Sequence, residues 1–147
     1  MKVVIQRSKE SNVVIDNKVY NEIDKGLVIL SCFTYGDTIE DIEYIVKKIV
    51  NLRIFDDENG VMNKSILDSG GSILSISQFT LYADTKKGNR PSYIMALPGS
   101  ESSKLYDIFN EELNKYVKTV TGVFGAEMLL NIKNDGPITI IIDSKNK

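Results

Sequence analysis

The sequence predicts a mixed α/β fold, with one strand-rich domain whose sheets are largely antiparallel and carry two long packed helices. Short β-branched runs separated by turn residues dominate the first third of the chain. Two later segments repeat apolar residues at the spacing of an amphipathic helix. The chain has 147 residues, near the commonest size of one domain, and no linker or internal repeat divides it. We therefore expect a single domain over residues 1–147, with a polar tail at 144–147.

The beginning of the chain is expected to form a meander of strands. The turn residues Asp16-Asn17 and Asp24-Lys25-Gly26 separate runs that are rich in valine and isoleucine. The expected strands cover residues 3–7, 12–15, 19–23 and 27–33. Strands joined by such short turns pair as hairpins, so this part of the sheet should be antiparallel.

Two amphipathic helices should pack on the sheet. The first begins near Asp37 or Thr38, since either side chain can cap a helix, and its apolar residues recur at helical spacing from Ile39 to Ile49. The second covers residues 101–117 and has a similar apolar face. The remaining expected strands are residues 53–55, 72–82, 120–124, 128–132 and 138–142.

Composition narrows the chemistry that is open to this chain. The net charge is −2 and the pI is about 5.2, so an RNA contact would need a local basic patch. The chain has no histidine and therefore lacks the usual general base. Cys32 is the only cysteine and lies in an apolar run, so we expect a buried, inert thiol and neither a metal site nor a cofactor. No apolar stretch approaches the ~20 residues that cross a bilayer, and the first residues are too soon polar for a signal peptide, so we expect no membrane contact and a cytoplasmic location.

Polar groups gather at the end of the expected strand 72–82. Strand alternation would put Gln78 and Thr80 on one face and Ser77 and Phe79 on the other. A threonine nucleophile needs a base to activate it. Only a lysine or a carboxylate such as Asp84 could serve, and no spacing marks a triad, so nothing in the sequence activates Thr80. An ordinary exposed strand end is the alternative interpretation.

A second polar segment contains Gly136-Pro137, directly before the expected strand 138–142. A turn before a strand is the simplest interpretation of this dipeptide. A cis bond would instead point two carbonyl oxygens in one direction, and Gly136 has no Cβ to block an approaching ligand. The sequence leaves both isomers open.

Two further segments have alternative interpretations. Residues 84–99 form a long expected loop that carries Lys86, Lys87 and Arg90. This charge run is either a solvated surface or a small phosphate clamp for an RNA end. In the segment 122–128, glycines flank Phe124, which indicates either a β-bulge or a pocket wall lined by backbone.

Two strings carry a resemblance to a known family. The first motif (residues 77–84, SQFTLYAD) and the second motif (residues 134–139, NDGPIT) resemble the two signatures of the D-aminoacyl-tRNA deacylases. The likeness extends over essentially the whole chain, including residues 2–7, 51–55, 62–63, 86–92 and 122–128. The departures are mild: Ile138 stands where valine is usual, and Tyr93 where phenylalanine is frequent.

The resemblance implies an ester hydrolase that releases D-amino acids from tRNA, and also glycine mischarged onto alanine tRNA. It implies a cytoplasmic homodimer with sites at the subunit interface, whose partners are the aminoacylated tRNA end and neither DNA nor a membrane. In this family, the Gly136-Pro137 bond is cis and reaches into the pocket of the other subunit, where its carbonyls reject L-amino acids. Arg7 resembles the residue that braces this dipeptide, and Lys86, Lys87 and Arg90 are the expected contacts to tRNA.

The resemblance also implies a mechanism without histidine. The 2′-hydroxyl of the tRNA helps to activate the water, and backbone amides near Phe79 and Phe124 stabilise the oxyanion, with Ser77 and Gln78 beside them. Thr80 as a nucleophile is the alternative within the same family. Two other classes stay open: a binding module that holds the tRNA end without hydrolysis, and a hydrolase of free D-amino-acid esters that is indifferent to tRNA.

Overall fold

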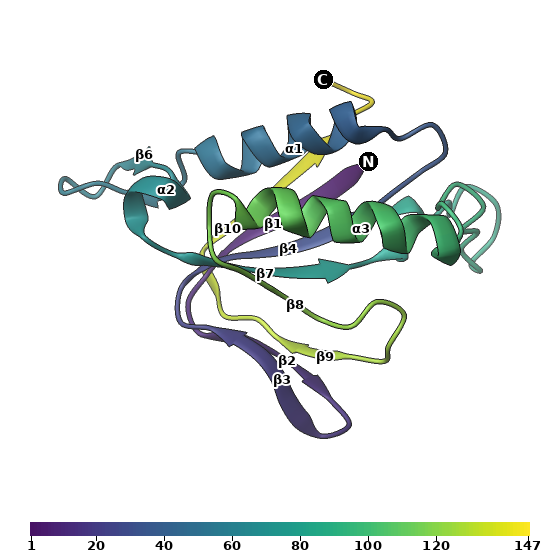
Figure 1. The fold of residues 1–147 in the computed structure, drawn as a ribbon, viewed down its shortest axis with the longest axis horizontal. Helices are drawn as coiled ribbons and strands as arrows, with labels where there is room; N and C mark the ends of the chain where they lie inside the picture. The colour runs from purple at the N-terminus through teal and green to yellow at the C-terminus, as the bar shows by residue number, and fades with distance from the viewer.

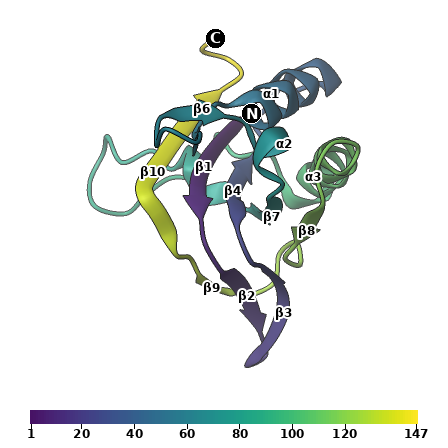
Figure 2. The same ribbon diagram turned by 90° about the vertical axis from the view of Figure 1, so that its left-hand side faces the viewer.

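The computed structural model describes residues 1–147 as three layers. Helices α1 (Ile39–Asn51) and α3 (Gly99–Asn114) cover one face of a five-stranded sheet. A three-stranded sheet packs against part of the opposite face (Figures 1 and 2). The predicted α/β class with two long helices is therefore confirmed, and no helix is long and apolar enough to cross a membrane.

The large sheet has an antiparallel half and a parallel half. In spatial order its strands are β10 (Asn134–Asp143), β1 (Lys2–Ser8), β4 (Gly26–Cys32), β7 (Ser72–Ser77) and β8 (Thr119–Thr121). Strand β1 is antiparallel to both of its neighbours, whereas β4, β7 and β8 run parallel to one another. Because β10 stands first in this spatial order, it is an edge strand, and Figure 2 shows it along one side of the sheet.

The smaller elements complete the three layers. The second sheet consists of β3 (Lys18–Ile23), β2 (Ser11–Ile15) and β9 (Leu129–Asn131), all antiparallel. A short hairpin joins β5 (Phe55–Asp56) to β6 (Met62–Lys64), and the one-turn helix α2 (Ile66–Ser69) follows it. A 3₁₀ turn, η1 (Phe79–Tyr82), follows β7 directly.

Both faces of the central strands are buried, which explains their continuous apolar sequences. On the helix side, Ile29 and Ile73 pack with Phe109 and the isoleucines of α1 in the larger core cluster. On the other side, Leu74 and Ile76 pack against Val13 of the second sheet. Strand β7 therefore runs between two apolar layers.

Several predicted boundaries are confirmed. The first four strands appear within one or two residues of their expected positions, and α1 starts directly after its predicted cap Thr38. Asp41 Oδ2 accepts a hydrogen bond from the Thr38 N–H at 2.9 Å, which completes the start of this helix. The second long helix begins at Gly99 and ends at Asn114, slightly earlier than expected.

Other boundaries were wrong. The expected strand 72–82 ends at Ser77, because the chain then turns into η1, and the predicted alternation of Gln78 with Phe79 across two sheet faces does not apply. The second motif lies inside β10 and not in a turn before it. The short strand expected at 53–55 is displaced to Phe55–Asp56, and the strands expected at 120–124 and 128–132 are shorter. The polar tail is anchored, since Ser144 is buried and its N–H donates to the Met1 carbonyl at 2.9 Å.

Candidate active site

The end of β7 opens into a cavity of about 510 Å³, which we call the β7 cavity. Three segments form its wall: Ser77–Phe79 of the first motif, the loop Phe124–Ala126, and a segment that we call the strap, residues 93–98. Apolar side chains, among them Ile76, Met128 and Leu130, contribute most of the remaining lining. The structure thus brings the first motif and Phe124 together in one cavity wall, which was one of the two interpretations of the Phe124 segment.

The lining of the β7 cavity contains no charged side chain. None of its 17 residues is Asp, Glu, Lys or Arg, and its only titratable side chains are Cys32 and Tyr93. Burial raises the pKa of Cys32 to about 11, so this thiol is neutral and inert at neutral pH, as expected. The chain also has no group of three or more His, Cys, Asp or Glu side chains arranged to hold a metal ion. The groups that this chain offers to a molecule in the cavity are therefore backbone groups and neutral side chains.

Thr80 lies beside the cavity and is not part of its lining. Its Oγ1 accepts a hydrogen bond from Gln78 Nε2 at 2.6 Å. An amide N–H can donate but cannot remove a proton, so this partner does not activate the hydroxyl as a nucleophile. The contact instead fixes the side chain of Gln78, which does line the cavity.

Phe79 stands at the rim and opens the turn η1. Its ring is 57% exposed and packs edge-on against Tyr93 of the strap, with 5.0 Å between ring centroids. The first N–H groups of a helical turn have no acceptor within that turn. The backbone amides at the start of η1 are therefore available to an oxygen atom held at the mouth of the cavity.

The loop that carries Phe124 is a turn between β8 and β9 and contains no β-bulge. Phe124 is half-buried and packs against Tyr106 of α3, with 5.8 Å between ring centroids. The Ser75 carbonyl of β7 accepts hydrogen bonds from Tyr106 OH at 2.8 Å and from the Gly122 N–H at 3.2 Å. These contacts tie the Phe124 loop to the strand that carries the first motif, which supports the pocket-wall interpretation.

The second motif lies apart from the cavity of its own chain. Gly136 and Pro137 are exposed on β10, and the bond between them is cis. Neither residue lines the β7 cavity. Gly136 has a φ of +117°, and an added Cβ would approach Ile138 Cγ1 at 2.8 Å, so the position requires glycine.

Arg7 links the second motif to another segment of the chain. Its Nη1 donates to the Ile54 carbonyl at 2.9 Å and also contacts Asp56 Oδ1 at 3.3 Å. Its Nε lies 3.1 Å from Asp135 Oδ2, so the buried guanidinium pairs with the residue that precedes Gly136. Arg7 therefore contacts the second motif through Asp135, next to the Gly136-Pro137 dipeptide.

The basic loop, residues 86–90, extends into solvent near the first motif. Lys86, Lys87 and Arg90 are exposed and take part in none of the ion pairs of the chain. Backbone hydrogen bonds of 2.8 and 2.9 Å between Asp84 and Ser92 close the base of this loop. The three charged side chains are therefore available to bind an anion.

Sequence reasoning missed the strap and Cys32 as parts of the cavity. The strap was assigned to a long loop suspected of function, but no residue pattern showed which of its members face inward. Cys32 was expected to be buried, and it is, yet its place in the lining depends on the chain turning at Gln78.

Comparison with known proteins identifies the class to which this fold and site belong. Residues 4–143 match the family described as D-Tyr-tRNA(Tyr) deacylase. A protein of Clostridium novyi (strain NT) named D-aminoacyl-tRNA deacylase is 53% identical over 151 aligned residues, which span 100% of this chain and 99% of that protein. The chain belongs to this deacylase family.

Two solved structures share the fold. One, described as c-Myc DNA Unwinding Element Binding Protein, superposes with a TM-score of 0.92 at 37% identity, covering 97% of this chain and 98% of that chain. The other, described as a probable eukaryotic D-amino acid tRNA deacylase, has a TM-score of 0.82 at 17% identity, covering 96% and 97% respectively. The second likeness shows the fold alone.

Proposed function

We propose that this protein hydrolyses the ester bond that joins a D-amino acid to the terminal adenosine of tRNA. Membership of the deacylase family supports the reaction class. The observation that carries the proposal is the β7 cavity, which gathers the first motif and Phe124 around a space without charged side chains. Such a lining suits an ester that is activated by its own neighbouring hydroxyl, because a side-chain base is lacking.

The proposed mechanism is substrate-assisted. The oxygen of a water molecule attacks the ester carbonyl carbon, and the bond from that carbon to the ribose oxygen breaks. The tRNA 2′-hydroxyl assists the transfer of a proton from the water toward the departing ribose oxygen. Backbone amides near Phe79 and Phe124 stabilise the oxyanion, with Ser77 and Gln78 beside the bound ester. Thr80 as a nucleophile is less well supported, because its side-chain partner is an amide donor.

Chiral selection is proposed to come from a second copy of the chain. Gly136 and Pro137 do not line the cavity of their own chain, so they can act on a bound ester only across a homodimer interface. In that position, their backbone would occupy the space that an L side chain needs, which is discrimination by exclusion. Glycine has no side chain to exclude, so the same device would also admit glycine mischarged onto alanine tRNA.

The basic loop is proposed to hold the tRNA end. Lys86, Lys87 and Arg90 are exposed, unpaired and close in sequence to the first motif, and phosphate contacts of this kind position a nucleic acid without reading its sequence. A function in quality control of tRNA charging would place the protein in the cytoplasm.

The direct test measures release of tyrosine from D-Tyr-tRNA, L-Tyr-tRNA and D-Tyr-tRNA whose terminal 2′-hydroxyl is replaced by hydrogen. We expect turnover of the first substrate only, because the second is excluded and the third lacks its activating group. Protection of the D-ester from spontaneous hydrolysis would indicate a binding module, and equal rates on a free D-tyrosine ester would indicate a general esterase. A DNA duplex serves as a binding control, since one related structure is described by a DNA-binding name.

A further inference from the structure

The strap forms one side of the β7 cavity, yet its own outward side chains do little to hold it. It contributes Tyr93, Ala96, Leu97 and Pro98 to the lining. Between these residues, Ile94 and Met95 are 75% and 53% exposed, and no helix or strand includes the strap. Its position therefore depends on the inward side chains Tyr93 and Leu97, which pack against Phe79 and the larger core cluster, and on hydrogen bonds to the rest of the fold.

Those bonds converge on the two residues that follow β4. The Leu97 N–H donates to the Phe33 carbonyl at 2.9 Å, and Thr34 forms an isolated bridge with Ala96. The only side-chain hydrogen bond in this contact runs from Thr34 Oγ1 to the Met95 carbonyl at 2.6 Å. Thr34 is 6% exposed, so little water reaches its hydroxyl.

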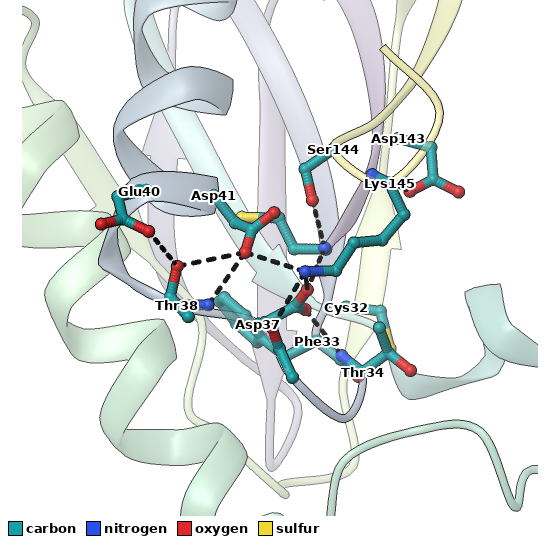
Figure 3. Close-up of polar contacts among 12 residues, drawn as sticks. Cys32, Phe33, Thr34, Asp37, Thr38, Glu40, Asp41, Asp143, Ser144 and Lys145 are labelled. Carbon is teal, nitrogen blue, oxygen red and sulfur yellow. Dashed lines mark hydrogen bonds and ion pairs between the residues drawn. The ribbon is translucent and has the colours of Figure 1, made fainter.

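Thr34 is itself held in a fixed position. Its N–H donates to Asp37 Oδ2 at 2.7 Å, and the Asp37 side chain is fully buried (Figure 3). Asp37 Oδ1 lies 2.6 Å from the α-amino group of Met1 and 3.2 Å from Lys145 Nζ. Two cations thus hold the Asp37 carboxylate in place, and this carboxylate accepts the hydrogen bond from the Thr34 N–H. The Thr34 hydroxyl points from this position toward the strap.

We propose that Thr34 is a positioning residue of the β7 cavity, whose hydroxyl fixes the strap at the distance that the bound ester requires. This inference rests on the proposed deacylase function and adds a residue outside both motifs to its binding wall. Losing the hydroxyl frees the Met95 carbonyl and lets the strap move away from the cavity. Substrate binding should suffer most, because the groups proposed to act at the ester carbonyl, near Phe79 and Phe124, lie on other segments.

The kinetic test compares Thr34→Val, which keeps the shape of the side chain, with Thr34→Ser, which keeps the hydroxyl. We expect Thr34→Val to raise KM for D-Tyr-tRNA about three- to tenfold, the range that one lost hydrogen bond supports, with kcat changed less than twofold. Thr34→Ser should behave like the wild type. Thr119→Val is the matched control: the Thr119 hydroxyl also donates to a carbonyl, that of Val117 at 2.9 Å, but it lies outside the cavity lining.

A second measurement does not depend on activity. Hydrogen exchange of the Leu97 amide reports directly whether the strap stays on Phe33. We expect faster exchange in Thr34→Val and no change in Thr34→Ser or Thr119→Val. If Thr34→Val does not fold, Thr34→Ala takes its place in both measurements.

The outcomes separate this inference from the proposed function. Unchanged KM and unchanged Leu97 exchange in a folded Thr34→Val protein would overturn the positioning role, as would an equal change in Thr119→Val. A wild-type protein without turnover would instead count against the deacylase proposal, and the Leu97 exchange rate would still decide whether the Thr34 hydroxyl holds the strap.

Discussion

The two motifs occupy very different surroundings. The first motif follows a strand that is buried on both faces, and hydrogen bonds from α3 and the Phe124 loop meet at the Ser75 carbonyl behind it. The second motif lies on an edge strand, with Gly136 and Pro137 exposed and Asp135 paired with the buried side chain of Arg7. The first motif lines a cavity, whereas the second motif lies at the surface.

This difference suggests a division of labour. A cavity with an uncharged lining can bind an ester and present backbone donors to it, but contacts with a side chain separate two mirror-image substrates only modestly. A rigid surface element can add exclusion if it is inserted from another copy of the chain. The contacts of the buried Arg7 with Ile54 and Asp135 lie within one chain and so hold that element without a partner.

The largest effect should follow from substitution of Gly136. We expect Gly136→Ala to lower D-ester turnover about a hundredfold, because the added Cβ would press on Ile138 and displace the proposed selective backbone. Turnover of D-Tyr-tRNA measures this change. Gly60→Ala, at another glycine with positive φ but with open space around it, is the matched control.

Mixing two inactive proteins tests whether the motifs act across an interface. Ala126→Phe should block the β7 cavity, and dimers that combine it with Gly136→Ala would contain one site without either defect. Random mixing should then restore about a quarter of wild-type sites, because half of the dimers are mixed and one of their two sites is intact. No recovery, in a mixture shown to form heterodimers, would mean that the second motif acts within its own chain.

Removal of the brace should have the next largest effect. We expect Arg7→Met to lower the free energy of unfolding by about 1–3 kcal/mol, because the Ile54 carbonyl loses its donor and Asp135 its partner. Turnover should fall as the second motif loosens. Urea unfolding measures stability, and Gln6→Ala, which loses one exposed hydrogen bond to Thr139, is the control. Equal changes in stability and turnover in Arg7→Met and Gln6→Ala would show that Arg7 does not brace the second motif.

The contrast between the motifs also shows what sequence patterns can predict. The start of α1 at Thr38 was predictable, because apolar periodicity and a capping residue are both local signals. The end of β7 was not. The residues after Ser77 alternate like a strand, but the Gln78 N–H bonds to the Ser31 carbonyl at 2.7 Å and the chain then turns into η1. The Gln78 bond continues the ladder between β7 and β4, and the local alternation does not show where this pairing ends.

Recognition of the motifs indicated candidate residues for the site but not the contacts that hold them. The partners of Arg7 come from two separate segments, Ile54–Asp56 and Asp135. No local sequence pattern predicts such contacts, because each depends on how segments far apart in the chain pair in the sheet. The strap was beyond prediction for the same reason, since its attachment to Thr34 joins residues about sixty positions apart.

Neutralising the basic loop should weaken binding without affecting the choice between D and L esters. With Lys86, Lys87 and Arg90 all changed to Gln, we expect KM for D-Tyr-tRNA to rise several-fold. The slope of its logarithm against the logarithm of salt concentration should fall by about 2, from three lost phosphate contacts. Lys9, Lys18 and Lys104, which are also exposed, provide a control with the same change of charge. An unchanged slope would place the tRNA contacts elsewhere.

Acid should lower the stability of the fold through Asp41. Burial alone would raise the pKa of Asp41, but hydrogen bonds from Lys145, Ser144 and the Thr38 backbone outweigh it and hold this pKa well below its ordinary value. A depressed pKa in the folded state means that the stabilisation is present above pH ~4, the pKa of an unfolded aspartate, and is lost as the pH falls further. Asp41→Asn should therefore reduce stability at pH 7 and flatten its decline below pH ~4 in urea unfolding. Parallel curves for the two proteins would show that other carboxylates dominate.

The smallest effect should follow from the removal of the Thr80 hydroxyl. We expect Thr80→Ala to keep D-ester turnover within about threefold of the wild type, because a nucleophile needs a base and the side-chain partner of Thr80 is an amide donor. The modest loss would come from Gln78, whose amide loses its acceptor while it still lines the cavity. Gln78→Ala is the informative companion, since it removes a lining side chain and should cost more than Thr80→Ala. If Thr80→Ala instead abolishes turnover in a protein that folds and dimerises normally, the threonine attacks the ester, and the first motif supplies the nucleophile as well as the wall.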